Sequence, residues 1–252
     1  MNELKPRTLD RLAKVSTATL TTVLFKRGLC NTFLQNVRPV GAGTPNMVGP
    51  AYTLRYIPAR EDLDTIEAFN DRTHPQRVAV EQCPAGHVLV MDSRGDASAA
   101  SAGNLLITRL LRRSVAGAVT DGGFRDSPEI AQMPFAAYHQ RPSAPTNLIR
   151  HHAMDIGLPI ACGGVAVYPG DLMVGDAEGV VCIPRDIADD VAATAYRQTL
   201  YEDWVAIEMD RGVGLFGTYP LTDPSQAQAF EDWKVANLHR YPLMDEAMGV
   251  AA

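Results

Sequence analysis

The most constraining feature of this chain is an apolar run at residues 116–120 that stops at Asp121-Gly122-Gly123. Apolar runs that end in paired glycines are typical of buried strands that meet a tight turn. If such a strand lies in a parallel sheet, its next polar residues reach the rim where α/β proteins bind ligands. Those residues are Arg125 and Asp126. The pattern therefore predicts an α/β fold with a ligand site at this turn.

The chemistry of the two residues fits a small anionic ligand. Arg125 offers a planar fork for a carboxylate, and Asp126 offers an anion for a hard metal ion or a proton. A helix-like segment at residues 103–113 begins at a glycine, so its first N–H groups are open to an anion. Taken alone, the pair fits a salt bridge that only stabilises a turn equally well. The glycine-rich surroundings favour the ligand site, because they leave backbone open to approach.

Composition limits the class of protein. The net charge of −6 argues against a dedicated nucleic-acid binder. No window approaches the roughly 18 apolar residues of a membrane span, and residues 1–10 lack an apolar signal core. We therefore expect a cytoplasmic protein with no nucleic-acid or membrane partner. The four dispersed cysteines are expected to be plain buried side chains.

Periodicity and turn residues predict the order of the elements. Segment 30–50 is expected to be a connection and segment 60–76 a helix or a loop, whereas residues 149–183 have the character of short strands. We expect strands at 51–57 and 87–92 and helices at 8–28, 187–211 and after Asp223-Pro224, with a short helix capped by Ser127.

Lysine placement bears on mechanism. The chain has Lys5, Lys14, Lys26 and Lys234, and no lysine lies between Lys26 and Lys234. A Schiff-base enzyme needs a desolvated lysine in its core. Carbanion chemistry here would therefore have to use a metal ion instead.

Four motifs in order give the chain a family resemblance. They are Gly103-x-Leu-Leu106, Ala116-Gly-x-Val-x-Asp-Gly-x-x-Arg-Asp126, Gly163-Gly-Val-x-Val-x-Pro-Gly-Asp171 and Asp176-x-x-Gly-Val-Val181. Over residues 8–211 the chain resembles the RraA-like superfamily. That superfamily includes the 4-hydroxy-4-methyl-2-oxoglutarate/4-carboxy-4-hydroxy-2-oxoadipate aldolases and the RraA regulators of ribonuclease E. The resemblance implies an RraA-like mixed α/β sandwich core with flanking helices at residues 1–211. A C-terminal helical extension would follow at residues 212–252.

The resemblance also implies a site. Arg125 and Asp126 would be the catalytic pair, with Asp126 holding Mg²⁺ or Mn²⁺ largely through waters and Arg125 binding a 2-oxo acid. Backbone at Gly103, Asn104, Leu105 and Leu106 would bind the substrate's carboxylate. Glu202 would be an acidic metal ligand supplied by a neighbouring subunit. The aldolases have an acidic residue at the position of Asn104, so this chain lacks one negative charge there.

We interpret the chain as a divalent-metal-dependent carbon–carbon lyase. A metal-stabilised enolate would form from a small 2-oxo acid by aldol cleavage or decarboxylation, releasing pyruvate or a similar product. The alternatives are a non-catalytic RraA-type regulator that binds a ribonuclease, and a metal-dependent sugar-acid hydratase or dehydratase. We expect a homotrimer or homohexamer, because the apolar residues of the late helices exceed the needs of a small core: Leu200, Trp204, Ile207, Phe230 and Trp233.

Overall fold

The computed structural model describes residues 4–244, and its contacts group into two compact units. Of the described residues, the first unit comprises 16–188, and the second comprises 4–15 and 189–244. The last residues of the predicted C-terminal extension, 245–252, lie outside the described residues. The extension's boundary at residue 212 stays a prediction.

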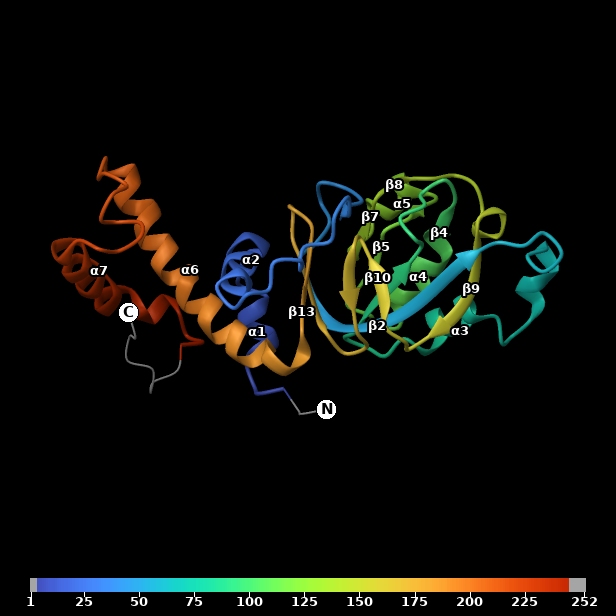
Figure 1. Cartoon of the computed structure of the whole chain (residues 1–252), viewed down its shortest axis with the longest axis horizontal. Coiled ribbons are helices and arrows are strands. Elements are labelled where there is room, and N and C mark those ends of the chain that lie inside the picture. Colours follow the sequence, from blue (N-terminus) through green and yellow to red (C-terminus); the bar gives the residue numbers. More distant parts are fainter. Residues whose placement is uncertain (1–3, 245–252) are drawn as a thin grey trace. The chain divides into compact units, whose positions relative to one another are not determined.

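The first unit is built on a mixed eight-stranded sheet, in which the long strand β2 runs beside β9 (Figure 1). The order is β1-β7-β5-β3-β2-β12-β13, with β9 also pairing with β2. Neighbours among β2, β3, β5 and β7 are parallel, and the other pairings are antiparallel. The strands are β1 Arg38–Pro39, β2 Met47–Pro58, β3 Val88–Asp92, β5 Gly117–Thr120, β7 Ala136–His139, β9 His151–Ile156, β12 Leu172–Gly175 and β13 Val180–Ile183. The predicted α/β fold and the strand after residue 116 are confirmed.

Two small sheets accompany the large one. A three-stranded parallel sheet contains β4 Ala100–Ala102, β6 Gly123–Phe124 and β8 Arg141–Pro142. A hairpin joins β10 Ile160–Cys162 to β11 Val165–Val167. Strand β6 begins at the second glycine of the Asp121-Gly122-Gly123 turn, so the chain passes from the large sheet into the small one there. Arg125 and Asp126 therefore follow directly after the short strand β6.

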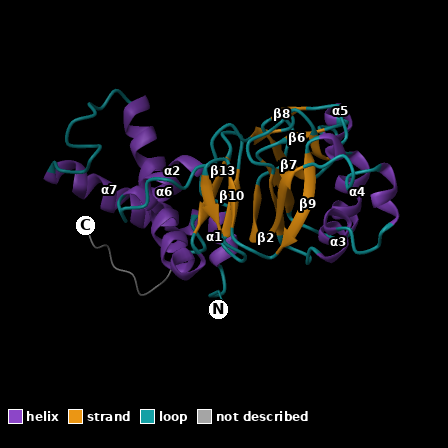
Figure 2. Ribbon diagram, turned by 45° about the vertical axis from the view of Figure 1, so that its right-hand side comes forward, coloured by secondary structure: helices purple, strands orange, loops and turns teal. Residues whose placement is uncertain are grey.

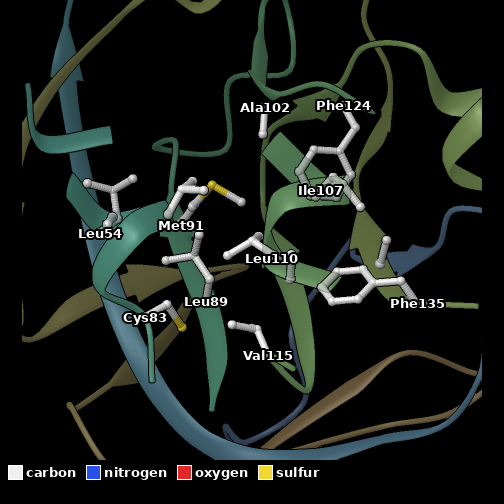
Figure 3. Close-up of a cluster of buried hydrophobic side chains, with 14 of the residues drawn as sticks. Leu54, Cys83, Leu89, Met91, Ala102, Ile107, Leu110, Val115, Phe124 and Phe135 are labelled. Carbon is white, nitrogen blue, oxygen red and sulfur yellow. The ribbon is translucent and has the colours of Figure 1, made fainter. Parts of the chain in front are cut away.

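Three helices lie on one side of the large sheet: α3 Pro75–Gln82, α4 Asn104–Arg112 and α5 Ser127–Ile130 (Figure 2). Between them and the sheet is a buried apolar cluster, where Ile107 and Leu110 of α4 face Leu89 and Met91 of β3 (Figure 3). Ile107 and Leu110 are three residues apart and lie on one face of the helix. Their burial fixes the rotation of α4, and the N-terminal end of that helix is thereby held against β6.

Two helix predictions are corrected. The helix expected at 8–28 is two helices, α1 Thr8–Leu12 and α2 Thr17–Phe25. The break lies at Ser16, which has an extended backbone and whose Oγ accepts the amide N–H of Thr19 at 3.1 Å. A serine in this position starts a helix better than it continues one. The cap expected at Ser127 is also wrong, because Asp126 occupies the N-cap position of α5 and Ser127 is the first helical residue.

Segments predicted less definitely are now assigned. Segment 60–76 contains a 3₁₀ turn, Ile66–Asn70, and the start of α3, and segment 30–50 contains β1 and the start of β2. Short 3₁₀ turns also occur at Asn147–Ile149 and Arg185–Ile187.

Three of the cysteines are buried as expected, but Cys30 is exposed. Burial raises the pKa of the Cys83 thiol to about 12, so this thiol stays protonated at neutral pH.

The second unit is helical. Its elements are α1, α6 Ala188–Asp210, α7 Pro224–Asn237 and a 3₁₀ turn at Leu238–Arg240. The long helix is confirmed, as is the Asp223 cap, whose carboxylate accepts the Ser225 N–H at 2.8 Å. Leu200, Trp204 and Phe230 are buried, and Phe230 packs against Trp204. These side chains therefore do not form the free apolar surface on which the trimer prediction was based. Within residues 4–244, no helix is long and apolar enough to cross a membrane.

His139 should make stability depend on pH. Burial and the charge of Arg38 lower its pKa to about 4, and its ring stacks on Phe124 at 5.7 Å. As pH falls from 6.5 to 4, the unfolded chain gains a proton that the folded one does not, so stability is lost in that window. We expect His139 to contribute about 3 kcal/mol to this loss. Urea unfolding at pH 7 and pH 4.5 should show a smaller difference for His139→Phe than for the unsubstituted protein. An equal difference would contradict the assignment.

Candidate active site at the entry of helix α4

The pairing of β4 with β6 brings two distant segments together. Ala102 pairs with Phe124 in a parallel register, and the Arg125 amide donates to the carbonyl of Ala102 at 3.0 Å. The residues that follow these strands therefore emerge side by side. They are Gly103, the N-cap of α4, and the Arg125-Asp126 pair. The structure thus brings the predicted anion-binding backbone to the predicted catalytic pair.

Asp126 is held in an unusual backbone conformation. Its φ of 55° and ψ of 33° lie in the left-handed region, which aspartate tolerates better than most residues. Its Oδ2 accepts the Asn104 N–H at 3.2 Å and lies 3.6 Å from Arg125 Nε. Within residues 4–244, Oδ1 has no protein hydrogen-bond partner. One carboxylate oxygen is therefore fixed to the helix entry, and the other is available to a ligand.

These groups line an open cleft of about 410 Å³, a volume typical of small-molecule sites. Arg125 and Asp126 remain accessible in it, with 47% and 32% of their side-chain areas exposed. The described residues that line the cleft are Phe69, Gln76, Arg77, Ala100, Ala102, Gly103, Asn104, Leu105, Leu106, Arg125, Asp126, Thr146 and Asn147. Arg125 Nε and Asp126 Oδ2 lie 3.6 Å apart, and both side chains share the cleft with further hydrogen-bond donors.

The backbone amides at the start of α4 differ in availability. The Asn104 N–H is bonded to Asp126, and the Leu106 N–H donates to the carbonyl of Gly103 at 3.1 Å. The Leu105 N–H has no protein acceptor in the described part of the chain. The Leu105 amide is therefore available to an acceptor atom of a ligand.

Asp121, which is not among the described residues lining this cleft, links its own turn to two other loops. Its carboxylate accepts the amides of Ser93, Gly95 and Gly163 at 2.7, 2.9 and 3.3 Å. Burial, opposed by these amides, raises the pKa of Asp121. The adjacent Gly122 has no room for a side chain, because a Cβ would lie 2.7 Å from Ser93 Cβ. The aspartate of the turn thus holds the surrounding loops, whereas Arg125 and Asp126, which follow Phe124, line the cleft.

The two predicted metal ligands belong to different units of the chain. Asp126 lies in the cleft, whereas Glu202 belongs to the second unit, where it accepts from Gln198 Nε2 at 3.0 Å. No cluster of three or more His, Cys, Asp or Glu side chains suited to a metal occurs within residues 4–244. The role of Glu202 as a ligand from a neighbouring subunit stays a prediction.

Four polar residues of the cleft were not found by sequence reasoning. Gln76 and Arg77 lie in the first turn of α3, and Thr146 and Asn147 come from the loop after β8. Pro75 at the first helical position was the one available signal for α3. No local sequence signal indicates that residue 147 lies in the cleft, because its position depends on pairing between distant segments.

Gly103→Ala should damage the site without unfolding the protein. An added Cβ would lie 2.6 Å from Arg125 Cγ and 2.7 Å from Asp126 Oδ2, so both side chains must move. We expect a loss of about tenfold or more in turnover, since misplaced groups lose their alignment with the substrate, and little change in Tm. Gly43→Ala is the matched control, because a Cβ there meets nothing within 4 Å. Equal activity of both variants would contradict the assigned close approach.

Comparison with known proteins identifies the family. The model of the RraA-like family (Aldolase/RraA) matches residues 13–182. The chain belongs to the RraA-like family. A relative from Halalkalibacterium halodurans, named "Putative 4-hydroxy-4-methyl-2-oxoglutarate aldolase", is 29% identical over 171 residues, covering 68% of this chain and 74% of the relative. Protein DlpA of Legionella pneumophila is 26% identical over 207 residues, which are 82% of this chain but 32% of that protein.

Solved structures agree on the RraA-like fold. The structure of RraAS2 from Streptomyces coelicolor, described as an unusual member of the RNase ES inhibitor RraA protein family, superposes with a TM-score of 0.70. It is 26% identical, and the match covers 81% of this chain and 98% of that one. An uncharacterized protein from Pseudomonas syringae has a TM-score of 0.74 at 23% identity, covering 87% of this chain and 100% of that one, and shows the fold alone.

Proposed function

We propose that this RraA-like protein is a divalent-metal-dependent lyase that releases pyruvate or a similar product from a 2-oxo acid. The observation that carries the proposal is the convergence of Arg125, Asp126 and the α4 entry in one cleft. Relatives named as 4-hydroxy-4-methyl-2-oxoglutarate aldolases support a reaction on a 2-oxo acid. The Arg125 guanidinium would bind the substrate carboxylate through two parallel hydrogen bonds, and the Leu105 amide would donate a third.

The donor set fits Mg²⁺ or Mn²⁺ in a water-rich site. Magnesium is often bound by one or two carboxylates and keeps several waters. Asp126 Oδ1 is unpartnered among the described residues, and the Asn104 amide holds the other oxygen in place. When bound, the metal would act as a Lewis acid toward the negative charge that develops on the 2-oxo oxygen. Within one chain Asp126 would be the metal ligand, with Glu202 of a neighbouring subunit as the second; this agrees with the lack of a three-residue metal cluster in the described chain.

Proton chemistry distinguishes the two lyase reactions. Aldol cleavage requires a group that takes the proton of the 4-hydroxyl, whereas decarboxylation breaks its carbon–carbon bond without one. Asp126 is the sole carboxylate among the described lining residues, and Asn104 cannot accept a proton at neutral pH. The cleft by itself is therefore equipped for decarboxylation. Aldol cleavage would need a base from elsewhere, such as Glu202 of a neighbouring subunit.

The test is divalent-metal-dependent pyruvate release. Purified protein is incubated with oxaloacetate, and separately with 4-hydroxy-2-oxo acids, with Mg²⁺ or Mn²⁺ and then with EDTA. We expect turnover that EDTA abolishes and added metal restores, measured against the metal-catalysed background without protein. Full activity in EDTA would refute the metal, and no release from any of these substrates would refute the lyase.

A second function is supported by the likeness to RraAS2, whose description names an inhibitor family. In a non-catalytic regulator the cleft would be vestigial and the surface would bind a ribonuclease. Substitution of Arg125 or Asp126 would then leave the protein's activity toward its partner unchanged.

A homotrimer or homohexamer is proposed for either function. Light scattering that shows a stable monomer at micromolar protein would exclude it, together with the role of Glu202.

A further inference from the structure

The cleft holds a second arginine besides Arg125. Arg77 lies in the first turn of α3, and its guanidinium carbon is 4.3 Å from the centroid of the Phe69 ring. Phe69 and Arg77 both line the cleft. Within residues 4–244 Arg77 forms no ion pair with a carboxylate. Stacking on an aromatic ring holds a guanidinium in place while leaving its N–H edges open to an anion.

A buried amide in the same cleft also lacks a partner. Asn147 is only 5% exposed as a residue, and its Nδ2 has no hydrogen-bond partner in the described structure. Its Oδ1 accepts from the hydroxyl of Thr146 at 3.3 Å. Buried amide N–H groups are almost always satisfied, so an orphan that lines a cleft points to a ligand that completes it.

Gln76, another buried amide of the cleft, differs from Asn147 in the hydrogen bonding of its side chain. It is as buried as Asn147 and lines the same cleft, but its Nε2 donates to the carbonyl of Ser101 at 2.7 Å. Of these two buried side-chain amides, one is satisfied and the other is not. Protein groups satisfy Gln76, whereas no described protein group accepts a hydrogen bond from Asn147 Nδ2.

We propose that Arg77 and Asn147 form a second anion subsite, which selects 2-oxo acids that carry a second carboxylate. The inference rests on the proposed function, in which Arg125 binds the carboxylate next to the 2-oxo group. One guanidinium and one neutral amide match the single charge of a carboxylate better than the double charge of a phosphate. Arg77 would then determine specificity, while Arg125 and Asp126 carry the reaction.

Calorimetric titration of the full chain, in a fixed excess of Mg²⁺, separates the two subsites. The ligands are 2-oxoglutarate and 2-oxovalerate, which share five carbons and the 2-oxo acid but differ in the second carboxylate. We expect 2-oxoglutarate to bind about tenfold tighter or more. Arg77→Met should remove that preference, and it should leave the affinity for 2-oxovalerate within about twofold, because only one ligand uses Arg77.

Two further variants complete the test. Arg72→Met is the matched control: it removes the same charge from an exposed residue outside the cleft, and the preference should remain. Asn147→Leu should weaken 2-oxoglutarate selectively, about three- to tenfold, provided that its circular dichroism is unchanged. Equal binding of the two ligands to the unsubstituted protein, or an unchanged preference in Arg77→Met, would overturn the second subsite and leave the proposed function standing. If neither ligand binds to the unsubstituted protein, the result contradicts the proposed function itself and not the second subsite alone.

Discussion

Asp126→Asn is expected to lose about 100-fold or more of kcat/KM for pyruvate release while the protein stays folded. The amide keeps an oxygen of similar size but carries no charge, so it is a poor ligand for a largely hydrated Mg²⁺. The backbone should not change, because asparagine adopts the left-handed conformation of residue 126 as readily as aspartate does. Activity is measured across a range of Mg²⁺ concentrations, and folding by thermal unfolding.

The control for this experiment is Glu129→Gln. Glu129 is exposed, lies three residues further along on α5 and does not line the cleft. The substitution removes the same unit of charge close to the site. We expect its kcat/KM to stay within about twofold of the unsubstituted value. If the two variants lose activity equally, the effect is one of general charge, and Asp126 has no specific role.

Arg125→Lys is expected to lose about 2–4 kcal/mol in kcat/KM, although the charge is retained. A guanidinium can bind both oxygens of a carboxylate, whereas an ammonium is a point charge on a flexible stem. Lysine would also lose the approach of Arg125 Nε to Asp126 Oδ2 at 3.6 Å. The affinity for oxalate, a planar dicarboxylate without a reacting bond, should fall together with turnover.

Arg109→Lys is the matched control for Arg125→Lys. Arg109 lies on α4 and pairs with Glu81 at 2.8 Å, outside the cleft. Exposed pairs of this kind contribute little, so turnover and oxalate affinity should stay unchanged. If Arg125→Lys and Arg125→Ala also leave both quantities unchanged, Arg125 is only a turn salt bridge to Asp126. The regulator would then be the better interpretation.

The three substitutions at the α4 entry can be told apart. Gly103→Ala moves both side chains, so it should weaken oxalate binding and turnover together. Asp126→Asn should change the dependence on Mg²⁺, whereas Arg125→Lys should change oxalate affinity at saturating metal. Arg77→Met should affect neither oxalate nor Mg²⁺ and should change only the preference for a second carboxylate. One set of titrations therefore tests the role of each residue separately.

The sequence by itself determined the central turn. An apolar run that ends in two glycines has few alternatives, because the glycines stop the strand. The strand β5, the start of α4 at Gly103 and the placement of Arg125 and Asp126 after the turn follow from such local signals. The Asp223 cap is another local signal, since the carboxylate accepts an amide two residues away. The helix break at Ser16 was also signalled locally, but the apolar spacing over residues 8–28 concealed it.

Only the tertiary structure decided which residues share the cleft with Arg125 and Asp126. Arg77 and Asn147 are separated by 70 positions, and each lies in a segment whose own sequence carries no sign of ligand binding. They line the same cleft because α3 and the loop after β8 are placed by contacts with the sheets. In the same way, Asp121 became a structural residue because three amides from two other loops converge on it. Periodicity and turn chemistry act over a few residues, whereas such convergence depends on strand pairing across the whole unit.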